Sequence, residues 1–321
     1  MRYREFGSTG EKLSVLCLGT WALGGKQFGA VPKRDAIDAV RTMIDQGVNF
    51  IDTAPIYAAG GSEEILGLAL RDGYRKSVFL VSKFGSEFID PDDNTKGTIK
   101  DSSRKNMLKS LEATLKRLET DYLDGYLMHW DDRVGTPLEE TIACMKELQA
   151  AGKVRFLGMS NLEQEMACRL LEEGVLDIVQ YPYSMVNRQK EDVLRHFASA
   201  GCGTMGYASL GGGILTGQFR ELPDFEAGDM RCAFYGPMFT EPGFSQIQQL
   251  LLVMDDIAAE RRAALSQIAI NWALSHDFMH STITGVRNAG EAKENCAGAD
   301  WELTAEELSR LDQAISQITI Y

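Results

Sequence analysis

Short apolar runs alternate along the chain with longer segments whose apolar positions recur at helical spacing. This alternation is typical of repeated βα units. The runs lack the in–out alternation of a sheet with one wet face, so we expect strands that are covered on both sides. The eight expected strands lie near residues 15–18, 49–52, 78–83, 123–129, 155–160, 178–180, 203–207 and 281–284.

Two of the intervening segments carry clear helix signals. Ser103 is the expected N-cap of a helix over residues 104–118. Residues 137–151 begin with proline, are acidic in the first turn and precede Gly152, as a helix should. Eight βα units close a barrel, so the predicted fold class is α/β, a (β/α)8 TIM barrel. No linker-like change in composition interrupts the sequence, which predicts a single domain over residues 1–321.

Three segments lie outside the repeat. Residues 2–13 contain a polar turn and are expected to form a small hairpin ahead of the barrel. Two long connections, residues 84–102 and 208–245, leave the carboxyl ends of the third and seventh strands. Loops of this length in a compact domain are usually functional or disordered. We expect these two to form walls of a substrate pocket.

The charge balance excludes some classes of partner. The chain has 33 basic and 46 acidic residues and a net charge of −13, which argues against nucleic acid and anionic membranes. No apolar stretch approaches the ~20 residues of a membrane span, and the first residues lack a signal region, so a cytoplasmic protein is expected. The six cysteines and four histidines show no spacing typical of metal ligands, so no metal is expected.

Four polar residues stand at or just after the downstream ends of expected strands: Asp52, Tyr57, Lys83 and His129. This rim is where barrel enzymes carry out their chemistry. A nearby lysine ammonium favours the phenolate and should lower the pKa of Tyr57, while a carboxylate holds the lysine charged. Tyr57 would then act as a general acid towards a carbonyl oxygen, or as a base towards an alcohol, with hydride from a cofactor. Each residue alone is more simply structural; together they favour the catalytic interpretation.

Polar and glycine residues at the remaining strand ends suit a dinucleotide. Ser160, Asn161 and Gln180 offer hydrogen bonds to a carboxamide, and Tyr207 offers a ring face for a nicotinamide. The glycines at 211–213 let the backbone approach phosphate oxygens, although a glycine trio is also typical of a flexible turn. No GxGxxG follows a strand, so the open two-sided nucleotide fold is not indicated.

At this point the chain resembles the aldo-keto reductases, including bacterial members. The resemblance implies a hairpin that plugs the barrel bottom and a nicotinamide cofactor across the top. It also implies Tyr57 as proton donor, and Trp21 and Trp130 as walls of a substrate pocket that includes Tyr57 and His129. The motifs that carry the resemblance are NFIDTAPIYAAGGSEEILGLAL (49–70), SKFG (82–85), LKRLETDYLDGYLMHW (115–130), GKVRFLGMSN (152–161), IVQYPYSMVNR (178–188), GYASLGGGILTG (206–217) and GVRNAGEAKEN (285–295).

The same resemblance implies a set of cofactor contacts along the upper rim of the barrel. These are Thr20, Trp21, Asp52, Ser160, Asn161, Gln180, Tyr207, Ser209, Leu210, Gly212, Leu215, Gly217, Gly285, Arg287, Glu291 and Asn295. Glu291 departs from the family, which often has Gln or Arg there. A carboxylate suits a ribose 2′-hydroxyl and repels a 2′-phosphate, whereas Arg287 suits the phosphate. The family precedent then favours NADP(H) slightly over NAD(H).

Other departures bear on the pocket. Ser209 and Gly212 replace a common proline and glutamine, which predicts a looser loop, and Asp131 replaces a proline after Trp130, which favours a polar substrate. We expect the pocket walls at residues 21–28, 84–95, 130–134 and 218–240. Four acidic residues lie in these segments: Asp131, Asp132, Asp224 and Glu226. They either favour a sugar-like substrate or form a solvated rim.

Two classes of function remain open at the level of sequence. The first is an oxidoreductase that moves hydride between a nicotinamide and an aldehyde, ketone or sugar-like compound, or the corresponding alcohol. The second is a non-catalytic subunit that senses redox state through bound cofactor, as the potassium-channel beta subunits suggest. A phosphate-binding barrel isomerase ranks lowest. The segment 234–239 (FYGPMF) looks exposed and is interpreted as a pocket lid or an interface patch, and the oligomeric state stays open.

Overall fold

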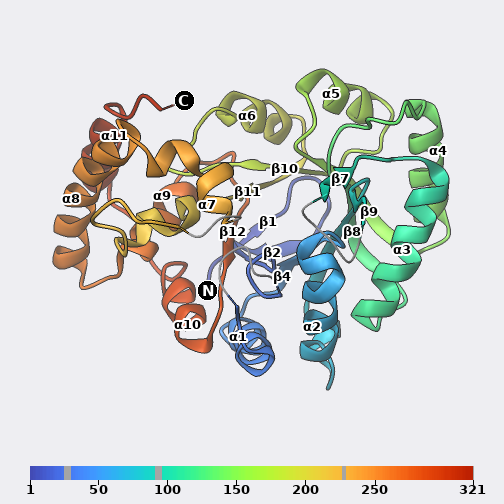
Figure 1. Cartoon of the computed structure of the whole chain (residues 1–321), viewed down its shortest axis with the longest axis horizontal. Helices are drawn as coiled ribbons and strands as arrows, with labels where there is room; N and C mark the ends of the chain where they lie inside the picture. Colours follow the sequence, from blue (N-terminus) through green and yellow to red (C-terminus); the bar gives the residue numbers. More distant parts are fainter. Residues whose placement is uncertain (25–29, 91–95, 226–228, 321) are drawn as a thin grey trace.

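Eight parallel strands close into a barrel, which confirms the predicted fold class (Figure 1). The computed structural model describes residues 1–24, 30–90, 96–225 and 229–320. Each strand lies within two residues of its predicted position. In their order around the barrel the strands are β3 (Leu16–Gly19), β4 (Phe50–Asp52), β5 (Phe79–Phe84), β8 (Leu123–Met128), β9 (Val154–Ser160), β10 (Ile178–Pro182), β11 (Gly203–Tyr207) and β12 (Ser281–Gly285), with β12 beside β3.

Helices surround the barrel and bury its outer face. Ser103 caps its helix as predicted, because its side chain accepts a hydrogen bond from the backbone N–H of Asn106. Two helices beyond the repeat, α8 (Gly243–Arg261) and α11 (Ala305–Ile315), lie side by side at one edge (Figure 1). The helices of the βα units are α1 (Lys33–Asp45), α2 (Gly61–Ala69), α3 (Arg104–Leu118), α4 (Leu138–Ala150), α5 (Gln164–Glu172), α6 (Glu191–Ser199), α9 (Leu265–Leu274) and α10 (Ala289–Ala297), and α8 lies in the connection between β11 and α9.

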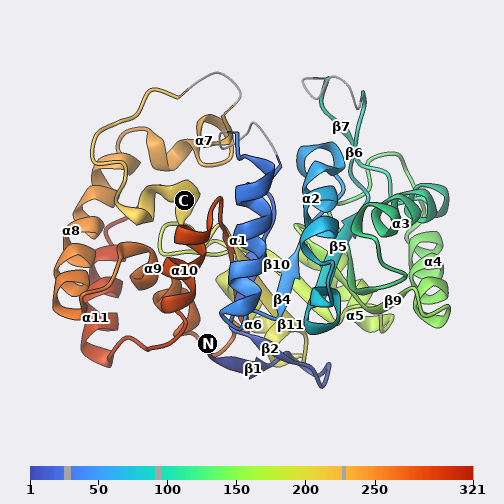
Figure 2. The ribbon, with the colours of Figure 1, turned by 90° about the horizontal axis from the view of Figure 1, so that it is seen from below.

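A hairpin closes the amino-terminal end of the barrel, as the resemblance implied. Its strands are β1 (Tyr3–Glu5) and β2 (Lys12–Ser14), and Figure 2 shows them at the end of the barrel away from α7 (Met230–Ala233). Phe6 enters the barrel, where its ring centroid lies 5.0 Å from that of Phe50. A Cβ on Gly203 would lie 2.4 Å from the Phe6 ring, so the plug requires glycine at that position. The interior is therefore packed from below, and the open end is the carboxyl end.

The two long connections rise from that open end (Figure 2). The first contains a short antiparallel pair, β6 (Glu87–Phe88) with β7 (Thr98–Ile99). The second contains a 3-10 turn at Gly211–Thr216, helix α7 and a further turn at Gly236–Phe239. In the described part of the chain, no helix is both long enough and apolar enough to cross a bilayer.

Candidate active site

Side-chain alternation along the strands brings the predicted catalytic residues to the top of the barrel interior. The apolar cluster inside the barrel includes Phe50, Val81 and Leu127. Asp52, Lys83 and His129 stand two residues further along the same three chain segments. Since residues i and i+2 of a strand share one face, these polar side chains form the next inward layer above the apolar one. Tyr57 reaches the same place from the turn that follows β4.

The ammonium of Lys83 is the centre of this layer. Its Nζ lies 2.7 Å from both carboxylate oxygens of Asp52, 2.9 Å from the carbonyl oxygen of Thr53 and 3.2 Å from the hydroxyl of Tyr57. The Lys83 side chain is fully buried and Asp52 is 3% exposed. Gln180 also donates from Nε2 to Asp52 at 2.8 Å. The buried charges are therefore paired and hydrogen-bonded, as a low-dielectric site requires.

The pKa of Tyr57 differs from the sequence-based expectation. Burial raises this pKa well above its usual value, and the carboxylate of Asp52 raises it further. We expected the Lys83 ammonium to lower it. The expectation was wrong for the free protein chiefly because burial disfavours the charged phenolate. In addition, both carboxylate oxygens of Asp52 contact Lys83 and offset its charge at the phenol. Tyr57 consequently keeps its proton at neutral pH, as an acid must before it donates.

His129 is present as a neutral imidazole. Burial lowers its pKa well below the usual value, and the charges of Lys83 and Lys100 lower it further. Its backbone N–H donates to the carbonyl oxygen of Phe84 at 2.9 Å, which fixes the residue just past β8. The imidazole lies edge-on to the Tyr57 ring, with centroids 6.0 Å apart. A neutral ring in this position can donate a hydrogen bond to an oxygen held beside Tyr57.

A buried carboxylate ties the tyrosine segment to the lysine strand. Glu63, on α2, accepts hydrogen bonds from Ser82 Oγ at 2.8 Å, Thr114 Oγ1 at 3.1 Å and Arg117 Nε at 2.7 Å. Ser82 precedes Lys83 on β5, and the other two donors lie on α3. The turn that carries Tyr57 runs directly into α2, so this network fixes it relative to Lys83.

A cavity of about 800 Å³ opens above the polar layer. Lys83 lies below its floor, and three residues that the family resemblance placed at the cofactor do not line it: Thr20 and Leu215 are fully buried, and Gly217 is outside the lining. The predicted site residues that do line it are Trp21, Asp52, Tyr57, His129, Trp130, Ser160, Asn161, Gln180, Tyr207, Ser209, Leu210, Gly212, Gly285, Arg287, Glu291 and Asn295.

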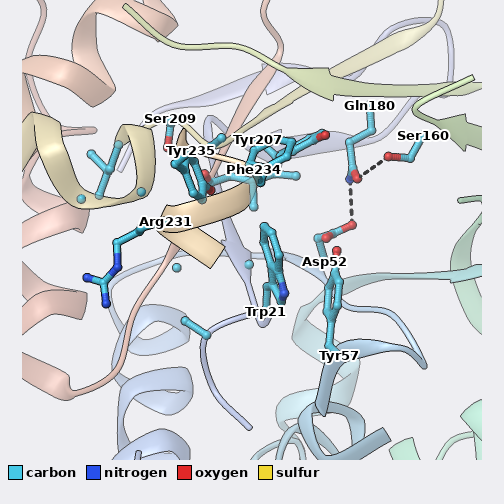
Figure 3. Close-up of a pocket in the computed structure, with 18 of the residues that line it drawn as sticks. Trp21, Asp52, Tyr57, Ser160, Gln180, Tyr207, Ser209, Arg231, Phe234 and Tyr235 are labelled. Atoms are coloured by element: carbon cyan, nitrogen blue, oxygen red, sulfur yellow. Dashed lines mark hydrogen bonds between the residues drawn. The ribbon is translucent and has the colours of Figure 1, made fainter. Parts of the chain in front are cut away.

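The expected carboxamide ligands form one connected chain of hydrogen bonds. Ser160 Oγ donates to Gln180 Oε1 at 3.0 Å, and Asn161 Nδ2 donates to Ser160 Oγ at 3.0 Å. Tyr207 donates its hydroxyl to Asn161 Oδ1 at 2.7 Å, which holds the edge of its ring (Figure 3 shows the ring beside the cavity). Amide and hydroxyl groups fixed in this way suit the donor and acceptor atoms of a nicotinamide carboxamide. Gly212 also lines the cavity at φ 67°, a conformation that favours glycine.

The segments expected to form pocket walls contribute several cavity residues that the sequence analysis did not name individually. Phe234 and Tyr235 line it, and the Phe234 ring stacks on Tyr207 with centroids 6.0 Å apart and planes inclined by 26° (Figure 3). The segment 234–239 was expected to be exposed, but Tyr235, Met238 and Phe239 are buried, because they pack onto the core. Of the two interpretations of this segment, the pocket wall is the one that the structure supports. Arg231, within the expected wall at 218–240, and Lys100, within the long connection 84–102, also line the cavity.

Of the acidic residues that suggested a sugar-like substrate, the three that the structure describes do not line the cavity. Asp131 is absent from its wall. Asp132 is structural, since its Oδ1 accepts hydrogen bonds from three consecutive backbone N–H groups, those of residues 134–136. Asp224 is exposed and outside the wall, and Glu226 lies outside the described residues. Parts of the expected walls at 25–28, 91–95 and 226–228 are likewise outside them.

Arg287 and Glu291, which favour opposite cofactors, form an ion pair with each other. Arg287 Nη2 lies 2.9 Å from Glu291 Oε1, and the Arg287 backbone N–H donates to Glu291 Oε2 at 2.9 Å. Both residues line the cavity at the start of α10. A 2′-phosphate must therefore compete with Glu291 for the guanidinium.

Comparison with known proteins assigns the fold and the site to a family. The sequence profile of the Aldo/keto reductase family matches residues 15–316, and the chain belongs to that family. It is 33% identical to the aldo-keto reductase YhdN of Bacillus subtilis, over 96% of this chain and 91% of that protein. It is 31% identical to a probable voltage-gated potassium channel subunit beta of Arabidopsis thaliana, over 98% of this chain and 97% of that protein.

The structural comparison agrees. The solved structure of a glycerol dehydrogenase from Gluconobacter oxydans superimposes with a TM-score of 0.88 and 27% identity, covering 99% of this chain and 96% of that one. The family assignment made from the sequence motifs is thereby confirmed.

Proposed function

We propose that this protein is a nicotinamide-dependent oxidoreductase that interconverts a carbonyl compound and its alcohol, with Tyr57 as proton donor. The observation that carries the proposal is the 3.2 Å contact between the Tyr57 hydroxyl and the Lys83 ammonium, which Asp52 holds from the other side. A phenol with a raised pKa holds its proton, and an ammonium beside it stabilises the phenolate once the proton has moved.

The chemistry balances with one hydride and one proton. When bound, a reduced nicotinamide would supply the hydride for the carbonyl carbon. Tyr57 gives its proton to the carbonyl oxygen, neutral His129 donates a hydrogen bond to the same oxygen, and Lys83 stabilises the remaining phenolate. In the reverse direction the phenolate accepts the proton of the alcohol. The substrate class is an aldehyde, a ketone or a sugar-like compound; glycerol dehydrogenase, a structural relative, supports testing polyols as well.

Residues on the β9 to β12 side of the cavity would hold the cofactor. Ser160, Asn161 and Gln180 would bind the carboxamide, and Tyr207 would stack on the nicotinamide ring. Arg287 would bind a 2′-phosphate once its ion pair with Glu291 opens. NADP(H) stays slightly favoured on family precedent, with NAD(H) as the competitor. The ring of Phe234 lies on Tyr207 in the free protein, so it must shift or share that face when a nicotinamide binds.

The second candidate is a regulatory subunit that binds cofactor without turnover. The similarity to a probable potassium channel subunit beta favours it, and the complete set of Asp52, Tyr57, Lys83 and His129 weighs against it. The test is oxidation of NADPH and NADH by the purified protein, followed by absorbance, with a panel of aldehydes, ketones and sugars. Catalytic consumption that depends on substrate supports the oxidoreductase. Tight cofactor binding without consumption across the panel supports the subunit.

A further inference from the structure

Among the described residues, three cationic side chains line the cavity, and they differ in their partners: Lys100, Arg231 and Arg287. Arg287 pairs with Glu291 at 2.9 Å, and Arg231 pairs with Asp229 at 2.5 Å. Within the described ranges, Lys100 has no carboxylate at ion-pair distance. Among the described residues it is thus the wall cation without an ion pair, although the charge of Asp131 acts on it from a longer distance.

Lys100 sits on the substrate side of the cavity. It follows β7, and its Nζ lies 4.1 Å from the centre of the Trp130 ring. Trp130 stacks in turn on His129, with centroids 5.9 Å apart and planes inclined by 27°. The cation–π contact is a preferred arrangement for an ammonium on a tryptophan face. The residues proposed for the cofactor lie on strands β9 to β12, whereas Lys100, Trp130 and His129 belong to the loops after β5 and β8.

The charge of Lys100 also costs free energy in the absence of an anion. The side chain is partly buried, and burial together with the nearby Arg133 lowers its pKa, although the carboxylate of Asp131 offsets part of this effect. The same charge contributes to the lowered pKa of His129, so it acts at the place where a substrate oxygen would bind. An anion beside Lys100 would offset part of this unfavourable desolvation.

We propose that Lys100 binds an anionic group of the substrate, so that the preferred substrates are carbonyl compounds carrying a carboxylate or phosphate a few atoms from the carbonyl. The proposal rests on the oxidoreductase function above and adds a substrate class to it. Trp21, Phe88 and Trp130 line the same part of the cavity and would cover the carbon chain between the two groups. The backbone of Lys100 is fixed there, since its carbonyl oxygen accepts a hydrogen bond from the Arg133 N–H at 2.8 Å.

The test compares matched substrates and matched variants. Succinic semialdehyde is paired with butanal, and glyceraldehyde 3-phosphate with glyceraldehyde, so that carboxylate and phosphate are examined separately. Lys100→Met removes the charge, Lys100→Arg retains it, and Lys105→Met removes a charge from the exposed face of α3 as a control. The wild type should prefer one anionic partner. Lys100→Met should raise KM for that partner about 10- to 100-fold, the factor expected for a hydrogen bond to a charged group, and change KM for the neutral partner less than about threefold.

Lys100→Arg should recover most of the loss, Lys105→Met should behave as wild type, and the cofactor dissociation constant should not move in any variant. Equal effects of Lys100→Met on charged and neutral substrates would overturn the proposal and leave the oxidoreductase function intact. If the wild type reduces none of these substrates, the proposed oxidoreductase function is rejected. Calorimetry then tests the anion site at Lys100 separately, by comparing the binding of 4-hydroxybutyrate and of butanol to the protein in the presence of cofactor. Binding of that anion that weakens about tenfold or more in Lys100→Met supports an anion site; absence of binding to the wild type overturns it.

Discussion

The ammonium of Lys83 lies 3.2 Å from the phenolic oxygen of Tyr57 and 2.7 Å from both carboxylate oxygens of Asp52. Lys83 and Asp52 have almost no access to water and Tyr57 is half-buried beside them, so charges here interact more strongly than in solution. The lysine is therefore both a structural partner of the carboxylate and a stabiliser of the charge that Tyr57 acquires.

Lys83→Met should remove both contributions. It leaves Asp52 buried without its cation, which we expect to reduce the free energy of unfolding by about 3–5 kcal/mol and to abolish most turnover. Chemical denaturation and single-turnover reduction measure the two effects. Asp52→Asn combined with Lys83→Met removes both charges and should recover stability without recovering turnover. A Lys83→Met protein of wild-type stability and wild-type rate would contradict the assignment.

The pH dependence of carbonyl reduction should be flat over an unusually wide range. The pKa of His129 is lowered, so the ring stays neutral below its ordinary value of about 6.5, and the pKa of Tyr57 is raised, so the phenol stays protonated beyond about 10. Reduction should fall only as Tyr57 loses its proton on the alkaline side, whereas alcohol oxidation should rise there. Single-turnover rates with an uncharged aldehyde would show this. An inflection near the ordinary histidine pKa would refute the neutral, buried His129.

Glu291→Gln should raise the preference for NADPH over NADH. The substitution removes the carboxylate that now occupies Arg287 at 2.9 Å, which leaves the guanidinium for a 2′-phosphate. The measurement is the ratio of the two dissociation constants by fluorescence titration, and we expect a change of about 10-fold, typical of one charge-assisted hydrogen bond. The control is Glu302→Gln, at a carboxylate that pairs with Arg2 and does not line the cavity. An unchanged ratio in Glu291→Gln would exclude a role for Glu291.

Much of the fold could be read from the sequence, because the mostly buried barrel strands form short apolar runs that alternate with segments of helical spacing. The catalytic layer could be read for a related reason. Asp52 and Lys83 follow the inward-facing Phe50 and Val81 by two residues, and this spacing is visible in the sequence itself.

What could not be read depends on long loops and on burial. Phe234 and Lys100 lie on the two long connections that were expected to form pocket walls. The path of these connections is set by tertiary packing, so no local pattern singled out either residue. The direction of the Tyr57 pKa shift was missed because the sequence shows the neighbouring charges but not the loss of water, which is the larger cause. Thr20 and Leu215 were placed at the cofactor by family resemblance, whereas in this chain they are fully buried.

Single-turnover reduction by Tyr57→Phe, followed by stopped-flow absorbance of the reduced cofactor, tests the central claim most directly. The substitution removes one hydroxyl and leaves the buried pair of Lys83 and Asp52 in place. Loss of the general acid should slow the hydride-transfer step about 10²- to 10⁴-fold, while the cofactor dissociation constant stays within about twofold of wild type. A Tyr57→Phe protein that reduces substrate at the wild-type rate would show that the proton comes from elsewhere.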